Sequence, residues 1–243
     1  MLGRLVKELG GYRASEAARY AETSAATVER WFRGYAAPGH RMAPVLGRRA
    51  GRLLSYLELV EVAFVADFRR LGMALERLRQ AHDYLRTTFG VAHPFAEVRF
   101  RSDGAHLLAP FGEGLVAADA GGQLAWATPI AQRLEQFDYE GGTVCRWYPR
   151  GRAGPIAIDP LVGFGAPVVE GTGLPTWVVR DRQRAGESTA AIAAELGLSE
   201  AQVEAALRFE GAAPGEAGRP AREPGGIDPE GGDTAGRDPS LRS

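Results

Sequence analysis

The chain has 243 residues, a formal net charge of −1, and 45% hydrophobic and 24% charged residues. A chain of this length can bury a sizeable core and form one to three domains. Its single cysteine, Cys145, excludes an intramolecular disulfide and a metal site built from several cysteines. The N-terminus lacks an apolar signal-peptide core, and no apolar run approaches the roughly 20 residues of a membrane span. We therefore expect a soluble, cytoplasmic protein.

Two short helices are expected near the N-terminus. Ser15 is the predicted N-cap of a helix over residues 16–21, and Ser24 is the predicted N-cap of a second helix that stops at Gly34. The second helix begins with small and hydroxyl residues and carries arginines one turn later. That arrangement suits the major groove of DNA, and the amide dipoles at the start of the helix favour a phosphate.

The N-terminal region is basic, and its charge continues beyond the second helix. Residues 1–55 contain ten Arg or Lys and four Glu, and residues 35–53 contain four arginines, two prolines, three glycines and no acid. A basic, turn-rich segment after a recognition helix indicates a wing that holds phosphates. The alternative is that its arginines are solvated on a surface loop. The predicted DNA-contacting residues are Ser24, Ala26, Thr27, Arg30, Arg33, Arg41, Arg48 and Arg49.

Residues 54–90 are expected to form two helices. Apolar residues recur at helical spacing on both sides of a break at Gly72, and acidic and basic residues balance at five each. We interpret this pair as a packing and dimerising element rather than a DNA-contacting face. The order of helix-turn-helix, basic wing and second helix pair resembles the MerR-type DNA-binding domain over residues 11–90. The long coiled-coil helix through which those regulators dimerise is absent from this pattern.

Short apolar segments separated by glycine-containing turns occupy residues 93–155. They predict a small, mostly antiparallel sheet. The segments 137–139 and 143–148 flank Gly141-Gly142 and are expected to pair as a hairpin.

Glycines and prolines force turns over residues 157–175, and three short helices are expected to follow. These helices span residues 176–184, 188–196 and 199–209. Ser188 and Ser199 are the predicted N-caps of the last two helices, and Gln202 stands at capping-box spacing from Ser199. A helix, a turn containing Gly197 and another helix also has the outline of a helix-turn-helix.

The sequence IDPLVGFGAPVVEGTGLPTWVV, followed by AGES and the helix pair, resembles a bacterial domain of unknown function, number 433, that occurs in VapB-like antitoxins. A MerR-like module followed by this domain resembles the long type of VapB-like antitoxin. The resemblance implies a homodimer that binds operator DNA and a toxin of the PIN-domain ribonuclease type. With the patterns described in this section, we expect an α+β chain whose parts are a MerR-like winged helix-turn-helix domain (1–92), a small antiparallel β-rich linking region (93–155), a three-helix antitoxin-like domain (156–209) and a disordered tail (210–243).

Charge decides which of the two helix-turn-helix outlines is expected to contact DNA. The segment 176–209 has four arginines against five acids, and Glu200 and Glu204 would face the phosphate-lined groove. DNA binding is therefore expected over residues 12–53, and a protein contact in the C-terminal helices. The predicted partner-binding residues are Arg180, Arg184, Glu200, Glu204 and Arg208.

The sequence offers little support for catalysis. The four histidines lack a metal-ligand spacing, and there is no P-loop, dinucleotide fingerprint or nucleophile–base set. We expect no enzymatic activity, no metal and no cofactor. Two alternatives to the antitoxin remain: a stand-alone MerR-like regulator with a ligand-sensing or dimerising C-terminal part, and an unusual nucleic-acid enzyme.

The last segment is expected to be a plain tail. Residues 211–243 contain eight glycines, five prolines and no aromatic residue. Such a segment buries too little apolar surface to offset the entropy lost on ordering, so disorder is predicted.

Overall fold

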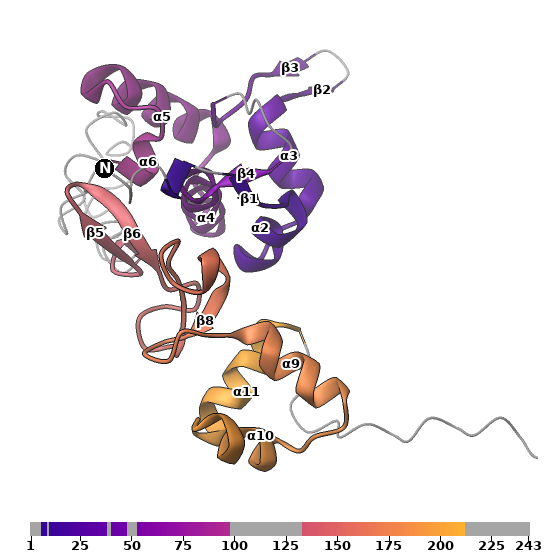
Figure 1. Cartoon of the computed structure of the whole chain (residues 1–243). Helices are drawn as coiled ribbons and strands as arrows, with labels where there is room; N and C mark the ends of the chain where they lie inside the picture. The colour runs from indigo at the N-terminus through magenta and orange to yellow at the C-terminus, as the bar shows by residue number, and fades with distance from the viewer. Residues whose placement is uncertain (1–5, 9, 38–39, 48–52, 98–132, 212–243) are drawn as a thin grey trace, which may run out of the picture.

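The computed structural model describes residues 6–8, 10–37, 40–47, 53–97 and 133–211 (Figure 1). Over these ranges the chain mixes helices with small antiparallel sheets, as expected. The described helices are α2 (Ala14–Tyr20), α3 (Ala25–Arg33), α4 (Tyr56–Arg70), α5 (Leu75–Phe89), α6 (Pro94–Glu97), α9 (Thr176–Arg184), α10 (Thr189–Leu196) and α11 (Glu200–Phe209). The described strands are β1 (Gly10–Tyr12), β2 (Tyr35–Ala37), β3 (His40–Met42), β4 (Leu54–Ser55), β5 (Phe137–Glu140), β6 (Thr143–Trp147), β7 (Ile156–Ile158), β8 (Pro167–Val169) and β9 (Leu174–Pro175).

The N-terminal helix pair forms as predicted, with one correction at its start. Ser15 is not the N-cap of α2, because the helix begins at Ala14 and the Glu16 carboxylate accepts a hydrogen bond from the Arg13 backbone N–H at 2.7 Å. Ser24 caps α3 by accepting from the Thr27 N–H at 3.1 Å. The helix ends at Gly34, where a Cβ atom would come within 2.3 Å of the Met42 carbonyl oxygen.

A two-stranded hairpin, β2–β3, follows α3 directly, and Tyr35 lies opposite Met42 in its register. The chain beyond the hairpin returns to α3, because the backbone N–H groups of Val45 and Leu46 donate to the Trp31 carbonyl oxygen at 2.8 and 3.0 Å. These bonds fix the base of the hairpin against the helix.

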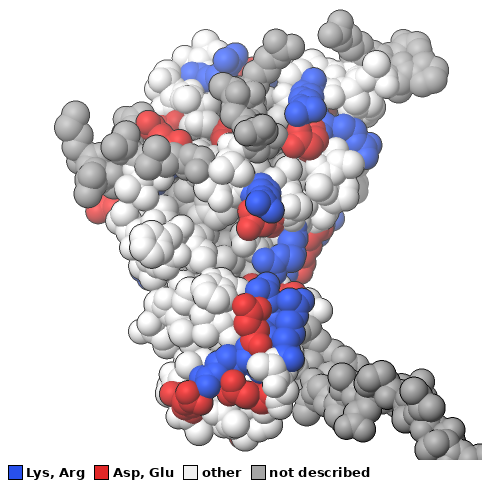
Figure 2. Space-filling model, turned by 45° about the vertical axis from the view of Figure 1, so that its right-hand side comes forward, with Lys and Arg blue, Asp and Glu red and all other residues white. Residues whose placement is uncertain are grey.

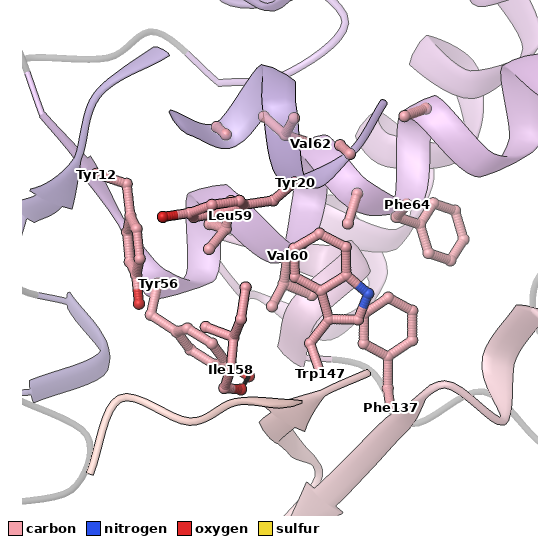
Figure 3. Packing of buried hydrophobic residues seen from close by; sticks show 14 of the residues in the cluster. Tyr12, Tyr20, Tyr56, Leu59, Val60, Val62, Phe64, Phe137, Trp147 and Ile158 are labelled. Carbon is pink, nitrogen blue, oxygen red and sulfur yellow. Dashed lines mark hydrogen bonds between the residues drawn. The ribbon is translucent and has the colours of Figure 1, made fainter. Parts of the chain in front are cut away.

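Helix α4 is the centre of the molecule (Figure 1). The spacing of apolar residues predicts a buried stripe, whereas twelve of the fifteen residues of α4 are buried. Neighbouring elements therefore cover it on several sides, and α2, α6 and β6 all pack against it. The labelled core residues around it are Tyr12, Tyr20, Tyr56, Leu59, Val60, Val62, Phe64, Phe137, Trp147 and Ile158 (Figure 3).

Strands β5 to β9 form one antiparallel sheet in sequence order. The predicted hairpin at Gly141-Gly142 is confirmed as β5–β6. The sheet continues through the pairing of Trp147 with Ile158, so it contains strands from both sides of residue 155. The expected strands between residues 98 and 132, the arginines Arg48 and Arg49, and residues 212–243 lie outside the described residues.

The three C-terminal helices have the predicted limits and caps. The hydroxyls of Ser188 and Ser199 accept from the Ala191 and Gln202 N–H groups, both at 3.2 Å. Buried side chains from α9, α10 and α11 form their shared core, among them Val179, Ile192, Val203 and Leu207. No helix in the described ranges is both long and apolar enough to cross a membrane.

Candidate DNA and partner surfaces

The predicted DNA-contacting residues of α3 share one accessible face. Ser24, Ala26, Arg30 and Arg33 are exposed, and Thr27 is half-buried. The hydroxyl oxygens of Ser24 and Thr27 are 2.8 Å apart, so the start of the helix presents two linked hydroxyls. Opposite this face, Val28, Trp31 and Phe32 are buried in the core.

The two arginines of α3 are only weakly engaged within the chain. Arg33 forms an exposed ion pair with Glu29 at 3.2 Å. Arg30 donates from Nε to the Ala26 carbonyl oxygen at 3.2 Å, and its guanidinium lies 6.0 Å from the centre of the Tyr35 ring. Exposed contacts of this kind contribute little free energy, so both guanidinium groups can exchange them for phosphate.

The accessible surface carries charges of both signs. On the face seen in Figure 2, acidic and basic side chains lie beside one another, and no continuous basic area is visible. A DNA contact on this face would therefore rest on individual arginines rather than on an extended basic surface. Of the other predicted residues, Arg41 lies in β3, opposite Ala36.

The residues predicted to bind a partner fall into two groups. Arg184, Glu200 and Arg208 are exposed, and Arg208 pairs with Glu204 one turn earlier at 3.3 Å. Arg180 is not part of this exposed group, because its Nη1 contacts the Glu210 carboxylate at 2.9 Å. The first group lies at the surface of the three-helix unit, and Arg180 lies where that unit meets the N-terminal helices.

Glu210 is the central residue of this junction, although the sequence placed it at the start of the tail. Its side chain is only 2% exposed. It accepts hydrogen bonds from Arg19 at 3.0 Å, Arg180 at 2.9 Å and the Thr176 hydroxyl at 2.6 Å. A buried carboxylate with three charged or polar donors holds three separate helices together. No local pattern relates Arg19 to a residue so far along the chain, and for this reason sequence reasoning missed the contact.

Aromatic and cationic groups surround the Glu210 contact. The rings of Tyr20 and Phe209 stack with centroids 5.5 Å apart. Arg150 lies 5.0 Å above the Phe209 ring and donates to the Tyr20 carbonyl oxygen at 3.1 Å. Burial raises the pKa of Tyr20 to about 12, and burial lowers the pKa of Arg150. Both shifts have the same physical cause, which is the partial removal of these groups from solvent.

A cleft of about 350 Å³ opens beside the junction. Its walls include charged residues of both signs and exposed aromatic rings, among them Glu16, Arg19, Tyr20, Phe164, Trp177 and Arg180. On one side the loop that carries Phe164 is attached to β1, because the Tyr12 hydroxyl donates to the Gly165 carbonyl oxygen at 2.8 Å.

A second buried ionic group lies within the helical core. Glu61 contacts Nε2 of His82 at 3.0 Å and Nδ1 of His93 at 3.2 Å, and it accepts from the Phe95 N–H at 3.4 Å. Sequence spacing gave no sign of this cluster, because the two histidines lie on different elements. Among the described residues, no group of three or more His, Cys, Asp or Glu is arranged to hold a metal ion. The cluster is an internal hydrogen-bonded group of one carboxylate and two imidazoles.

The C-terminal part of the chain matches the model of a known protein family. Residues 156–209 match the family model described as "Protein of unknown function (DUF433)", which covers β7 to α11.

Two relatives from Mycobacterium tuberculosis extend the likeness over most of the chain. The chain is 26% identical over 221 residues to "Putative antitoxin VapB45", a match that covers 81% of this chain and 92% of that protein. It is 28% identical over 200 residues to "Uncharacterized protein Rv2308", covering 76% of this chain and 83% of that protein. The crystal structure of Rv2018 from the same organism superposes with a TM-score of 0.62 at 23% identity, covering 82% of this chain and 98% of that chain, and shares the fold.

Proposed function

We propose that the chain is a DNA-binding antitoxin, which neutralises a partner toxin and, as a homodimer, represses its own operon. The observation that carries this proposal is the similarity to the protein called an antitoxin, because it spans 81% of this chain and 92% of that protein and so extends well beyond the C-terminal family match. On this reading the chain acts by binding in the cytoplasm and has no enzymatic activity of its own.

The DNA-contacting part is proposed to be α2, α3 and the β2–β3 hairpin, arranged as a MerR-like winged helix-turn-helix. The exposed hydroxyls at the start of α3 and the weakly paired Arg30 and Arg33 support this assignment. In this arrangement α3 enters the major groove, and phosphates are held by Arg41 of the hairpin together with Arg48 and Arg49, which follow it in the sequence.

The toxin-contacting part is proposed to be the outer surface of α9 and α11. Arg184, Glu200, Glu204 and Arg208 offer charges of both signs there, and Arg180 supports the surface through its contact with Glu210. The resemblance to VapB-like antitoxins suggests a toxin of the PIN-domain ribonuclease type as the partner.

Co-expression with the product of the gene adjacent to its own tests this proposal. A tag on this chain is expected to recover the neighbour's product in a stable complex. The double variant Glu200→Ala with Arg208→Ala should recover less, whereas Arg30→Ala with Arg33→Ala should recover as much as the unaltered chain. If the unaltered chain binds operator DNA but recovers no partner, the antitoxin assignment is wrong.

One observation favours the alternative of a stand-alone regulator that senses a ligand. A pocket of about 240 Å³ in the sheet is lined by Arg146, Asp159 and Glu170, which are convergent polar groups. Arg146 is held within it by Asp159 at 3.1 Å. On this alternative, a small charged metabolite raises the melting temperature of the chain and changes its affinity for DNA, and Arg146→Ala abolishes both effects.

A further inference from the structure

Arg79 is an arginine of α5 whose guanidinium group binds its own chain. Its side chain is only 13% exposed. Nε donates to the Pro44 carbonyl oxygen at 2.9 Å, and Nη2 donates to the Ala43 carbonyl oxygen at 2.6 Å. Nη1 contacts the carboxylate of Glu76, which lies one turn earlier on α5 and balances the charge. The planar guanidinium therefore binds two successive backbone carbonyl groups at once.

The two carbonyl groups belong to the hairpin exit, which we define as residues 43–46, directly after β3. The first two residues of the exit accept the hydrogen bonds from Arg79 on α5. The last two donate their backbone N–H groups to the Trp31 carbonyl oxygen on α3, at 2.8 and 3.0 Å. The hairpin exit is therefore bound to both helices within four residues.

The start of the hairpin lies against the same exit. Gly34, between α3 and β2, has a φ of 69°, and a Cβ atom there would come within 3.1 Å of the Pro44 nitrogen. Farther along β2, Tyr35 and Ala36 are exposed, so this strand has little packing against the core. The direction of the hairpin relative to α3 therefore depends on the contacts at its base, and Arg79 supplies two of them.

Arg79 differs from the arginines assigned to DNA contact. Arg30 and Arg33 have exposed contacts that a phosphate can replace. The guanidinium of Arg79 is mostly buried and is engaged through all three of its nitrogen atoms. A phosphate would have to displace hydrogen bonds that are shielded from solvent, so a direct DNA contact by Arg79 is disfavoured.

We propose that Arg79 is a positioning residue for DNA binding, which holds the hairpin in the direction that lets the hairpin and α3 contact one duplex. This inference rests on the proposed function, in which α3 enters the major groove and the hairpin region holds phosphates. A hairpin that moves on its base has to be ordered when DNA binds, and the entropy lost in that step lowers affinity. Arg79 therefore raises operator affinity without touching DNA.

The variant Arg79→Lys tests this role, because lysine keeps the charge but lacks the planar fork that binds two carbonyl groups. Operator affinity should fall by about tenfold, measured at one salt concentration and well below the melting temperature. An arginine that binds phosphate directly would tolerate the change better, since an ammonium group also binds phosphate. Arg86→Lys is the matched control on α5, where Arg86 is 56% exposed and pairs with Asp83 at 3.5 Å. It should change affinity by less than about twofold.

The same substitution in a second background shows whether Arg79 acts through the hairpin region. Replacing Arg41, Arg48 and Arg49 together by alanine removes the phosphate contacts proposed for that region. In this background Arg79→Lys should change operator affinity by less than about twofold, because the two effects share one cause and are not additive. A full tenfold loss in this background would show that Arg79 acts elsewhere and would overturn the inference.

Amide hydrogen exchange without DNA separates this inference from the proposed function. Arg79→Lys should speed exchange over residues 35–46 and leave exchange in α4 unchanged. Unchanged exchange over residues 35–46, or operator affinity equal to that of the unaltered chain, overturns the positioning role while the antitoxin assignment stands. An unaltered chain that binds no operator DNA overturns both this role and the DNA-binding part of the proposed function.

Discussion

At the scale of single residues, the arginines around the N-terminal helices differ in whether their contacts within the chain are buried or exposed. Arg19 and Arg150 contact buried partners in the junction with α11. Arg30 and Arg33 have only exposed contacts on α3. The second pair remains available to a ligand, because exchanging an exposed contact for a phosphate costs little free energy. This difference, rather than the number of arginines, makes α3 the candidate for DNA contact.

Removing the two exposed arginines should weaken DNA binding selectively. Arg30→Ala with Arg33→Ala is expected to reduce operator affinity and to lower the slope of log affinity against log salt by about 1 for each phosphate that is no longer neutralised. Gel-shift titrations over a range of salt concentrations measure both effects. Arg208→Ala removes another exposed arginine, this one from α11, and should change neither. An unchanged midpoint and slope in the double variant would remove α3 from the interface.

The buried Glu61 cluster makes the free energy of unfolding depend on pH. The sign of that dependence follows from the hydrogen bonds within the cluster. Burial tends to lower the pKa of His93, but the hydrogen bond and charge of Glu61 outweigh it and raise the pKa above the ordinary 6.5. Burial tends to raise the pKa of Glu61, but hydrogen bonds from His82 and His93 outweigh it and lower the pKa below the ordinary 4.5. The contribution of His93 to the free energy of unfolding is therefore complete below its ordinary pKa. It is lost as pH rises through the pKa that His93 has in the folded chain. The contribution of Glu61 to the same free energy is present above its ordinary pKa. It is lost as pH falls through the pKa that Glu61 has in the folded chain.

The variant His93→Gln tests the predicted loss of stability at higher pH. The unaltered chain should lose unfolding free energy as pH rises above about 6.5, the ordinary pKa of a histidine, and His93→Gln should show a flatter profile over the same range. Urea denaturation at a series of pH values measures the difference. Parallel profiles for the two proteins would show that His93 is not held in its protonated form.

At the scale of elements, local contacts were predictable from sequence and distant ones were not. The caps at Ser24, Ser188 and Ser199 form within three residues, so the residue types alone indicate them. Ser15 failed as a cap because a competing local bond, from the Arg13 N–H to the Glu16 carboxylate, starts the helix earlier.

The contacts that assemble the candidate surfaces join elements far apart in the chain. The pairing of Trp147 with Ile158 carries the sheet past residue 155, and the contact of Arg19 with Glu210 joins α2 to the end of α11. Neither leaves a periodic signal in the sequence. The bonds from Arg79 to the hairpin exit likewise join positions 35 and 36 residues apart.

The junction between α2 and α11 should contribute measurably to stability. Glu210→Ala leaves Arg19 and Arg180 without their shared buried partner, so the free energy of unfolding is expected to fall by about 1–3 kcal/mol. Glu200→Ala removes an exposed carboxylate from the other end of α11 and should change stability by less than about 0.5 kcal/mol. Chemical denaturation of the three proteins measures both values. Equal decreases in the two variants would mean that the Glu210 contact is not specifically stabilising.

At the scale of the whole molecule, the two proposed surfaces belong to one packed body. The end of α11 contacts α2 through Arg19, and α2 packs against α3, so the partner surface and the DNA surface are connected through the Glu210 junction. The similarity to the M. tuberculosis protein called an antitoxin spans 81% of this chain and so extends well beyond the C-terminal family match. This is the arrangement expected if, as proposed above, one protein binds a toxin through its C-terminal helices and DNA through α3.

Growth of a bacterial culture that expresses the neighbouring gene's product tests the antitoxin assignment most directly. Expression of that product alone should arrest growth, and co-expression of this chain should restore it. Arg30→Ala with Arg33→Ala should restore growth equally well, because neutralisation of the toxin does not require DNA binding. Growth that is unaffected by the neighbour's product, or an arrest that persists in the presence of the unaltered chain, would contradict the assignment.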